Sequence, residues 1–167
     1  MCAEWRIKRE CLNGILGAVA ANMEKELEGV ETVYSVARRI SKRYSLGEYV
    51  VLGGEVPDDV LLSAVSICRR RFKEEDIILM NVLDDEQQGE IGIVLTEEGC
   101  FVWNEKFLFN FNYKDIESVD YNDEDMEVYV KANDEDYTIE LSGDEDEHYP
   151  RKWYNLLLDI REIYKGE

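Results

Sequence analysis

Apolar residues follow two different periods along this chain. Up to about residue 72 they recur every three or four positions, which is the spacing of one helical face. From about residue 75 they alternate with polar residues, which is typical of strands with one buried face. The change predicts an α+β fold, with a helical region over 1–73 and a β-rich domain over 74–167.

The helical period predicts about three helices before the change of pattern. The first carries Gly14, Gly17 and several alanines, which let another element approach closely, so its partner is either a helix of the same chain or a second copy in a homodimer. The third ends in the triplet Arg69–Arg71, whose cations either compensate the helix dipole or bind an anion or a partner. The predicted ranges are 4–27, 30–44 and 57–72, with a short strand over 48–52 between the last two.

The alternating pattern predicts seven short strands separated by clusters of Asn, Asp and Gly. Even spacing of this kind is typical of an antiparallel sandwich or a partly open barrel. A final helix begins near Pro150 and carries an apolar stripe that includes Trp153 and Tyr164. The strands are predicted over 77–83, 90–95, 100–103, 107–111, 116–121, 126–131 and 137–141.

Three stretches of the β-rich part have the character of a known family. They are the acid-led strand over 74–78, the hairpin from Gly92 to Trp103 with its Thr96 and Gly99 turn, and the stretch from Tyr113 to Val119. They resemble stretches of the bacterial pleckstrin-homology-like (PH-like) domains, as does a Trp in the last helix. The resemblance implies a seven-stranded antiparallel barrel closed by a C-terminal helix. It also implies a domain that binds a protein or peptide, because such barrels commonly act as interaction modules.

Charge separates the two regions and excludes several ligands. The chain carries 38 acidic and 19 basic residues, for a net charge of −19. Residues 1–72 hold 11 basic and 10 acidic residues, and residues 73–167 hold 8 basic and 28 acidic ones, so the β-rich part alone carries −20. A field of this sign repels phosphate, so nucleic acid is not an expected partner. The loop after the first strand contains Asp84, Asp85 and Glu86 and no base, so phosphoinositide binding is not expected either.

The acidic turns are the candidate interaction surface. Solvated hairpin turns are the simplest interpretation, and calcium binding is an alternative, although no turn has the complete spacing of a calcium loop. The aromatic residues from Trp103 to Tyr113 are interpreted as core, with an exposed strip beside an acidic rim as the alternative. The candidate surface residues are Asp84, Asp85, Glu86, Asp123, Glu124, Asp125, Asp144 and Asp146.

Catalytic chemistry has little support in the sequence. His148 is the only histidine, so no Ser-His-Asp or Cys-His set can be assembled, and a surface position at the start of the last helix is expected for it. The four cysteines (Cys2, Cys11, Cys68 and Cys100) show neither zinc spacing nor a disulfide framework. No signal peptide or membrane span is expected, so a cytoplasmic protein without cofactor is predicted.

These features predict a non-enzymatic protein-interaction module with an unknown protein or peptide partner, which its acidity suggests is basic. The alternative is an acidic inhibitor or immunity protein that occupies a basic, nucleic-acid-binding surface of another protein. Binding of such an inhibitor through charge should weaken steeply as salt is added, because salt screens the attraction between the two proteins.

Overall fold

The computed structural model describes residues 24–25, 27–43, 50–52, 57–83, 89–104, 106–141 and 148–165. Most of the helix predicted over 4–27, and with it the predicted homodimer contact, lies outside this range. So do Cys2, Cys11 and the acidic residues Asp84, Asp85, Glu86, Asp144 and Asp146.

The described helices and strands follow one another in the order that the sequence pattern predicts. Helices α2 (Val33–Arg43), α3 (Asp58–Ile67) and α4 (Tyr149–Lys165) correspond to three of the predicted helices. The short strand β1 (Val50–Leu52) lies inside the range predicted for it. All seven strands of the β-rich part are present: β2 (Leu79–Val82), β3 (Gly92–Leu95), β4 (Gly99–Trp103), β5 (Leu108–Asn112), β6 (Ile116–Asn122), β7 (Glu127–Ala132) and β8 (Glu135–Glu140).

The strands form two antiparallel sheets and no closed barrel within the described part of the chain. Sheet A has the order β1-β2-β3-β4-β5, and sheet B has the order β6-β7-β8. The seven-stranded barrel that the resemblance implies is therefore not closed, because the strands of the β-rich part divide four and three between two sheets. The ladder ends after β5 because the chain turns through a 3₁₀ helix, η2 (Tyr113–Asp115), before β6 begins and pairs with β7 alone.

Tyr113 fixes the corner between the two sheets. Its side chain is fully buried, and its hydroxyl donates toward the carbonyl oxygens of Thr96 at 3.0 Å and Gly99 at 2.9 Å. Burial is the main cause that raises the pKa of this phenol well above its usual value, so it stays a hydrogen-bond donor. The corner is thereby tied to the turn between β3 and β4.

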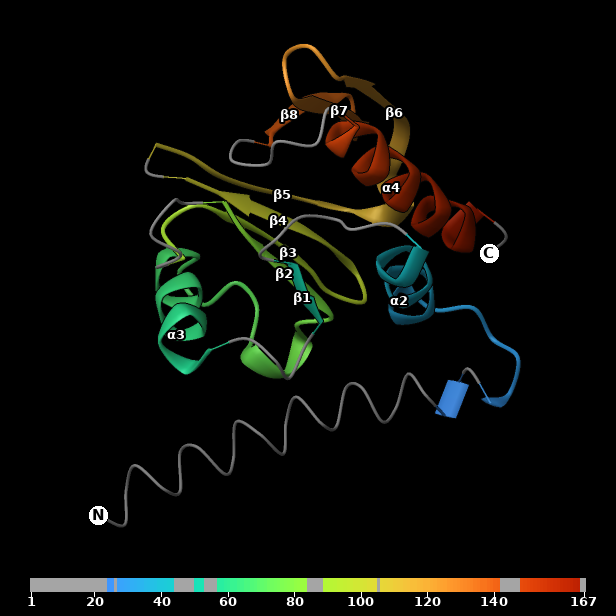
Figure 1. Ribbon diagram of the computed structural model, residues 1–167, viewed down its shortest axis with the longest axis horizontal. Helices are drawn as coiled ribbons and strands as arrows, with labels where there is room; N and C mark the ends of the chain where they lie inside the picture. The colour runs from blue at the N-terminus through green and yellow to red at the C-terminus, as the bar shows by residue number, and fades with distance from the viewer. Residues whose placement is uncertain are drawn as a thin grey trace.

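Sheet A is covered on both faces (Figure 1). One face packs on α3 through a cluster that includes Leu61, Phe72 and Trp103. The other face packs on α2, α4 and sheet B through a larger cluster that includes Val36 and Trp153. Adjacent side chains of a strand point to opposite faces of the sheet, and in β2 Met80 belongs to the first cluster and Leu79 to the second.

Helices α2 and α4 lie beside each other on the second face (Figure 1). Helix α2 begins after Thr32, which forms a reciprocal cap with Ser35: the Ser35 amide donates to the Thr32 hydroxyl at 3.2 Å, and the Thr32 amide donates to the Ser35 hydroxyl at 2.8 Å. Helix α4 buries Trp153, as predicted, and binds sheet B through Arg161, whose Nε donates to the Ile116 carbonyl at 2.9 Å.

Candidate functional site

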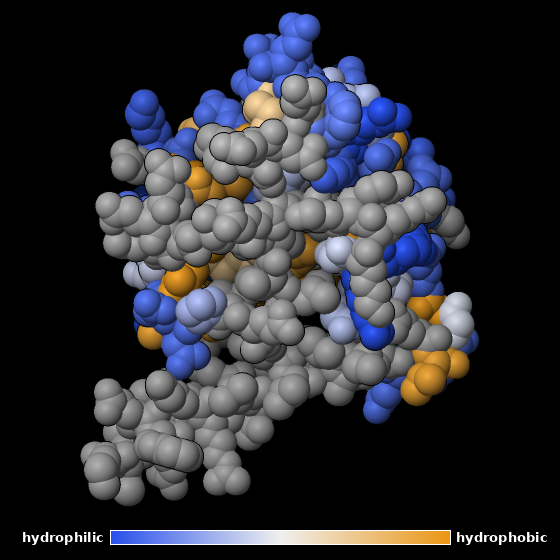
Figure 2. Space-filling model, in the orientation of Figure 1, coloured by the Kyte–Doolittle hydropathy of each residue, from blue (hydrophilic) through white to orange (hydrophobic). Residues whose placement is uncertain are grey.

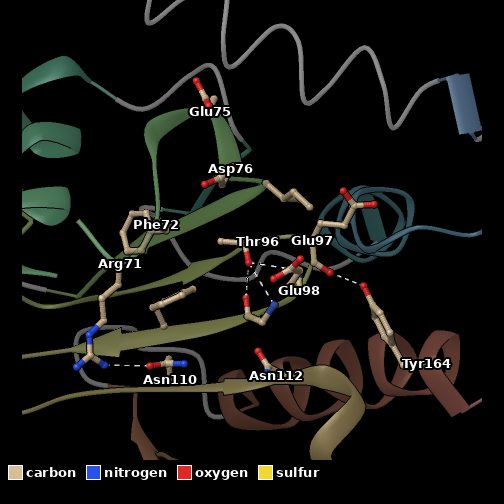
Figure 3. A pocket seen from close by; sticks show the side chains of 13 residues that line it. Arg71, Phe72, Glu75, Asp76, Thr96, Glu97, Glu98, Asn110, Asn112 and Tyr164 are labelled. Atoms are coloured by element: carbon tan, nitrogen blue, oxygen red, sulfur yellow. Dashed lines mark hydrogen bonds between the residues drawn. The ribbon is translucent and has the colours of Figure 1, made fainter. Parts of the chain in front are cut away.

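A cleft of about 550 Å³ opens on the α3 side of sheet A. It is assembled from the segment after α3, the 3₁₀ helix η1 (Glu74–Asp76), the turn between β3 and β4, strand β5 and the last turn of α4 (Figure 3). Its lining combines Arg71, Phe72, Glu75, Asp76, Ile78, Thr96, Glu97, Glu98, Gly99, Phe101, Asn110, Asn112 and Tyr164.

The end of α3 carries Arg71 into the cleft. The helix closes with two backbone bonds, from the Arg70 amide to the Val65 carbonyl at 2.9 Å and from the Arg69 amide to the Ser66 carbonyl at 3.0 Å. This pair of bonds defines a Schellman cap, which reverses the chain direction. Arg71 then reaches β5, where its guanidinium donates to Asn110 Oδ1 at 3.1 Å (Figure 3).

The turn between β3 and β4 supplies two carboxylates of the cleft. The Thr96 hydroxyl accepts from the amides of Glu98 at 3.3 Å and Gly99 at 3.2 Å, and it lies 3.0 Å from the Gly99 carbonyl, to which it donates. This bonding holds the turn closed while the side chains of Glu97 and Glu98 stay exposed. A hydrogen bond from the Tyr164 hydroxyl to the Glu97 carbonyl connects the same turn to α4 (Figure 3).

The lining is acidic at its rim and aromatic at its floor. Glu75, Asp76, Glu97 and Glu98 carry four carboxylates against the single guanidinium of Arg71, which leaves three net negative charges. The rings of Phe72 and Phe101 pack with centroids 5.0 Å apart beneath them. An arrangement of this kind favours a ligand that has a cationic group and an apolar body.

A lysine of the same chain already binds one of these carboxylates. Lys25 Nζ forms an ion pair with Glu97 Oε1, and about half of each side chain is exposed. The contact joins positions 72 residues apart in sequence. It shows that the rim accepts an ammonium group in the geometry that the fold provides.

The described part of the predicted acidic surface lies outside the cleft. Of its eight residues, Asp123, Glu124 and Asp125 are described, and they form the turn between β6 and β7. Asp123 Oδ2 lies 3.8 Å from Nδ1 of the exposed His148, an ion pair when that histidine is protonated. Asn122 bonds Asp125 and the Glu124 amide within the turn. Among the described residues no group of three or more His, Cys, Asp and Glu is placed to hold a metal ion.

The aromatic strip is partly core and partly exposed. Trp103, Phe111 and Tyr113 are buried, as predicted, whereas Phe107 is 39% exposed. Phe107 stacks on Phe109 with centroids 5.5 Å apart, and Phe109 stacks on Tyr137 of β8 at 5.2 Å. The strip therefore begins in the core and emerges at the seam between β5 and β8.

The sequence predictions missed most of the cleft. Arg71 was identified as part of a triplet with an alternative binding role, but Glu75, Glu97, Glu98 and Asn110 were assigned only to strands and turns. The available signal was the alternation in β5, where Asn110 and Asn112 are separated by Phe111 and so share the face opposite to it.

Both described cysteines are structural. Cys68 ends α3 and is fully buried, and burial raises its thiol pKa to about 12. Burial also raises the pKa of the Cys100 thiol, which lies on the opposite face of sheet A. Neither side chain lines the cleft, so neither supplies a nucleophile there.

Searches against protein-family models, curated proteins and solved structures give no significant match to this chain. No helix in the described ranges has the length and apolar character needed to cross a membrane.

Proposed function

We propose that this chain is a non-enzymatic protein-interaction module of the bacterial PH-like type, whose cleft binds a basic segment of a partner protein. The observation that carries the proposal is the rim of four carboxylates above an aromatic floor, with one guanidinium among the lining residues. Contacts of Lys or Arg with such a rim give charge selectivity, and the floor accommodates their aliphatic stems.

The order of the elements supports the PH-like type. Apart from β1, which adds a fifth strand to sheet A, the seven strands of the β-rich part divide four and three between the sheets and are followed by one helix that buries Trp153. The residues that carry the resemblance have structural roles in this chain: Thr96 and Gly99 shape the turn, and Tyr113 holds the corner. Fold alone does not assign a function, so the cleft carries the functional part of the proposal.

The bonding of the lining groups supports binding rather than catalysis. Thr96 carries the aliphatic hydroxyl among the described lining residues. Its oxygen forms three hydrogen bonds with backbone groups of the turn. The carboxylates of Glu75 and Asp76 contact Lys73, through its ammonium at 3.4 Å and its amide at 3.0 Å respectively. The printed contacts of these described carboxylates are with a lysine and a backbone amide, and none is with a nucleophilic side chain.

Peptide display tests this function although the partner is unidentified. A random peptide library is selected on the full chain and on the variant Glu75→Lys/Glu98→Lys, which reverses two charges of the cleft. We expect enrichment of Lys- and Arg-containing peptides on the unchanged chain and loss of that enrichment on the variant. Absence of basic enrichment, or enrichment that persists on the variant, contradicts the proposal.

A second candidate function has a separate observation in its favour. The outer face of sheet B is acidic, because the strand register places Asp120, Glu127, Asp136 and Glu140 on one side with Lys131. Tyr129 is exposed at the centre of this face, and hydrophilic residues gather at this end of the molecule (Figure 2). Such a face fits the acidic inhibitor that covers a basic surface of its target.

The same charge reversal on sheet B distinguishes the two functions. The variant Asp136→Lys/Glu140→Lys changes the net charge by the same amount as the cleft variant but leaves the cleft intact. If the cleft is the site, peptides selected on the unchanged chain bind this variant with affinity reduced less than threefold. If the peptides lose binding to the sheet B variant and keep it on the cleft variant, the inhibitor function is supported and the cleft is excluded as the binding site.

A further inference from the structure

The unpaired edge of β5 borders the cleft. In the ladder between β4 and β5, the Asn104 amide donates to the Phe107 carbonyl at 3.0 Å, and the Tyr113 amide donates to the Glu98 carbonyl at 3.1 Å. Hydrogen-bonded and non-bonded pairs alternate in an antiparallel ladder, so Phe109 and Phe111 are bonded to β4. The backbone groups of Leu108, Asn110 and Asn112 therefore point away from β4, toward the free edge of sheet A.

No other described strand pairs with this edge. Exposed edges are usually protected by charged residues, proline or a bulge. β5 reads Leu-Phe-Asn-Phe-Asn and has none of these, although 34% of all residues in the chain are charged. The edge strand of sheet B differs, because β8 carries Glu135, Asp136 and Glu140. Among the described strands, β5 is thus an edge strand whose own sequence contains no charged residue or proline.

The two sides of β5 present different chemistry. Asn110 and Asn112 line the cleft, on the side of the carboxylate rim and Arg71. Phe109 faces the other side, where it stacks between Phe107 and Tyr137. A strand added to this edge would therefore alternate in its environment. One set of its side chains would lie on the side of the cleft, which four carboxylates and Arg71 line, and the next set on the side of the aromatic rings.

We infer that the partner binds by strand addition: an extended segment with alternating basic and apolar residues pairs with the free edge of β5 and places its basic side chains at the cleft. This inference rests on the proposed function and specifies the form of the ligand. The ion pair of Lys25 with Glu97 is the intramolecular precedent for the charged contact. Complementary charge selects a basic partner segment over a second copy of β5, which carries none.

The test uses a defined peptide in place of the unknown partner. The fluorescein-labelled, amidated peptide Lys-Val-Lys-Val-Lys-Val is titrated with the full chain, and anisotropy is measured. Its control is Lys-Lys-Lys-Val-Val-Val, which has equal charge and composition without alternation. We expect the alternating peptide to bind at least tenfold more tightly than the block peptide.

Backbone methylation of the peptide tests the pairing itself. Amides are N-methylated at the first, third and fifth positions in one peptide and at the second, fourth and sixth in another. Because only alternate amides of an added strand face β5, we expect one pattern to lose binding at least tenfold and the other to lose less than threefold. Equal effects of the two patterns overturn strand addition.

A pair of variants tests the edge from the side of the protein. Asn110→Pro removes an outward N–H that is not used in the ladder with β4, and Asn110→Ala keeps that N–H while removing the amide that contacts Arg71. We expect the Pro variant to weaken the alternating peptide at least fivefold relative to the Ala variant. If Asn110→Pro does not fold, as judged by circular dichroism, the methylation patterns decide on the unchanged chain.

The outcomes separate the two proposals. If both peptides bind equally, the methylation patterns have equal effects and the Glu75→Lys/Glu98→Lys variant abolishes binding, then the basic cleft stands and strand addition fails. If neither peptide binds, both proposals fail. If sedimentation velocity instead shows that the chain self-associates, and neither peptide changes that equilibrium, the edge serves self-association and the inferred partner is wrong.

Discussion

At the scale of single residues, Gly99 is needed for space rather than for an unusual backbone angle. Glycine is common in tight turns because it can adopt a positive φ, but Gly99 does not adopt one. A Cβ atom at this position would lie 2.5 Å from the Phe111 carbonyl oxygen and 3.3 Å from Asn112 Cα. The absence of a side chain therefore permits β4 and β5 to approach at the edge of the cleft.

Replacement of this glycine should destabilise the protein. Since the obstructing atoms belong to the backbone of β5, Gly99→Ala forces the strands apart, and we expect the free energy of unfolding to fall by about 1–3 kcal/mol. Urea unfolding followed by circular dichroism measures the change. Glu98→Ala, at the exposed neighbouring position, is the control and should remain within about 0.5 kcal/mol of the unchanged chain. Equal stability of the two variants would show that the turn relaxes without cost.

At the scale of elements, the cap of α3 places two arginines in a conformation that glycine prefers. Arg69 and Arg70 have φ values of 53° and 55°. The left-handed region costs an L-residue about 1–2 kcal/mol. The two Schellman bonds hold the turn in place, and the chain then delivers Arg71 to Asn110.

Removal of the Cβ atom at the first of these positions should stabilise the protein. We expect Arg69→Gly to raise the free energy of unfolding by up to about 1 kcal/mol, because the relief of strain exceeds the added entropy of the unfolded chain. The control Ser66→Gly, at an exposed position inside α3, should lower it by about 1 kcal/mol. Thermal and urea unfolding measure both. A loss of stability in Arg69→Gly would mean that its side chain contributes more than the strain costs.

The elements themselves were predictable because their apolar patterns are local. All seven strands of the β-rich part lie close to their predicted ranges, and Pro150 lies in the first turn of α4 as expected. The sequence predicts a corner at residues 113–115, but not that the strands divide into two sheets there, because Tyr113 bonds two carbonyls that lie 14 and 17 residues earlier. The cleft was missed for the same reason, since its lining spans Arg71 to Tyr164 and only the fold brings these residues together.

At the scale of the whole molecule, helices α2 and α3 pack against the sheets. Val36 and Ile40 of α2 belong to the same core as Trp153 of α4 and Val130 of sheet B. A buried hydrogen bond from Asn81 Nδ2 of β2 to the Tyr149 hydroxyl joins sheet A to α4. The apolar core is therefore continuous from α2 to sheet B, and the acidic residues lie outside it.

That distribution of charge gives salt two opposite effects on this protein. A net charge of −19 makes the folded surface repel itself, and added NaCl shortens the Debye length from about 30 Å at 0.01 M to about 3 Å at 1 M. We expect the unfolding temperature to rise by a few degrees between 0.02 and 0.5 M NaCl, with about 1 kcal/mol corresponding to roughly 2–4 °C for a chain of this size.

Over the same range of salt, binding of the basic peptide should weaken, because screening reduces its attraction to the carboxylates of the cleft. Chloride is used since sulfate stabilises proteins through exclusion from their surface and would obscure the charge effect. Calorimetric unfolding and peptide anisotropy in the same buffers measure the two trends. If the unfolding temperature stays constant while binding weakens, the repulsion is already relieved by local ion pairs, and the charge of the cleft acts on the partner alone. If binding is independent of salt, the carboxylates do not recognise the peptide, and the aromatic floor must account for its affinity.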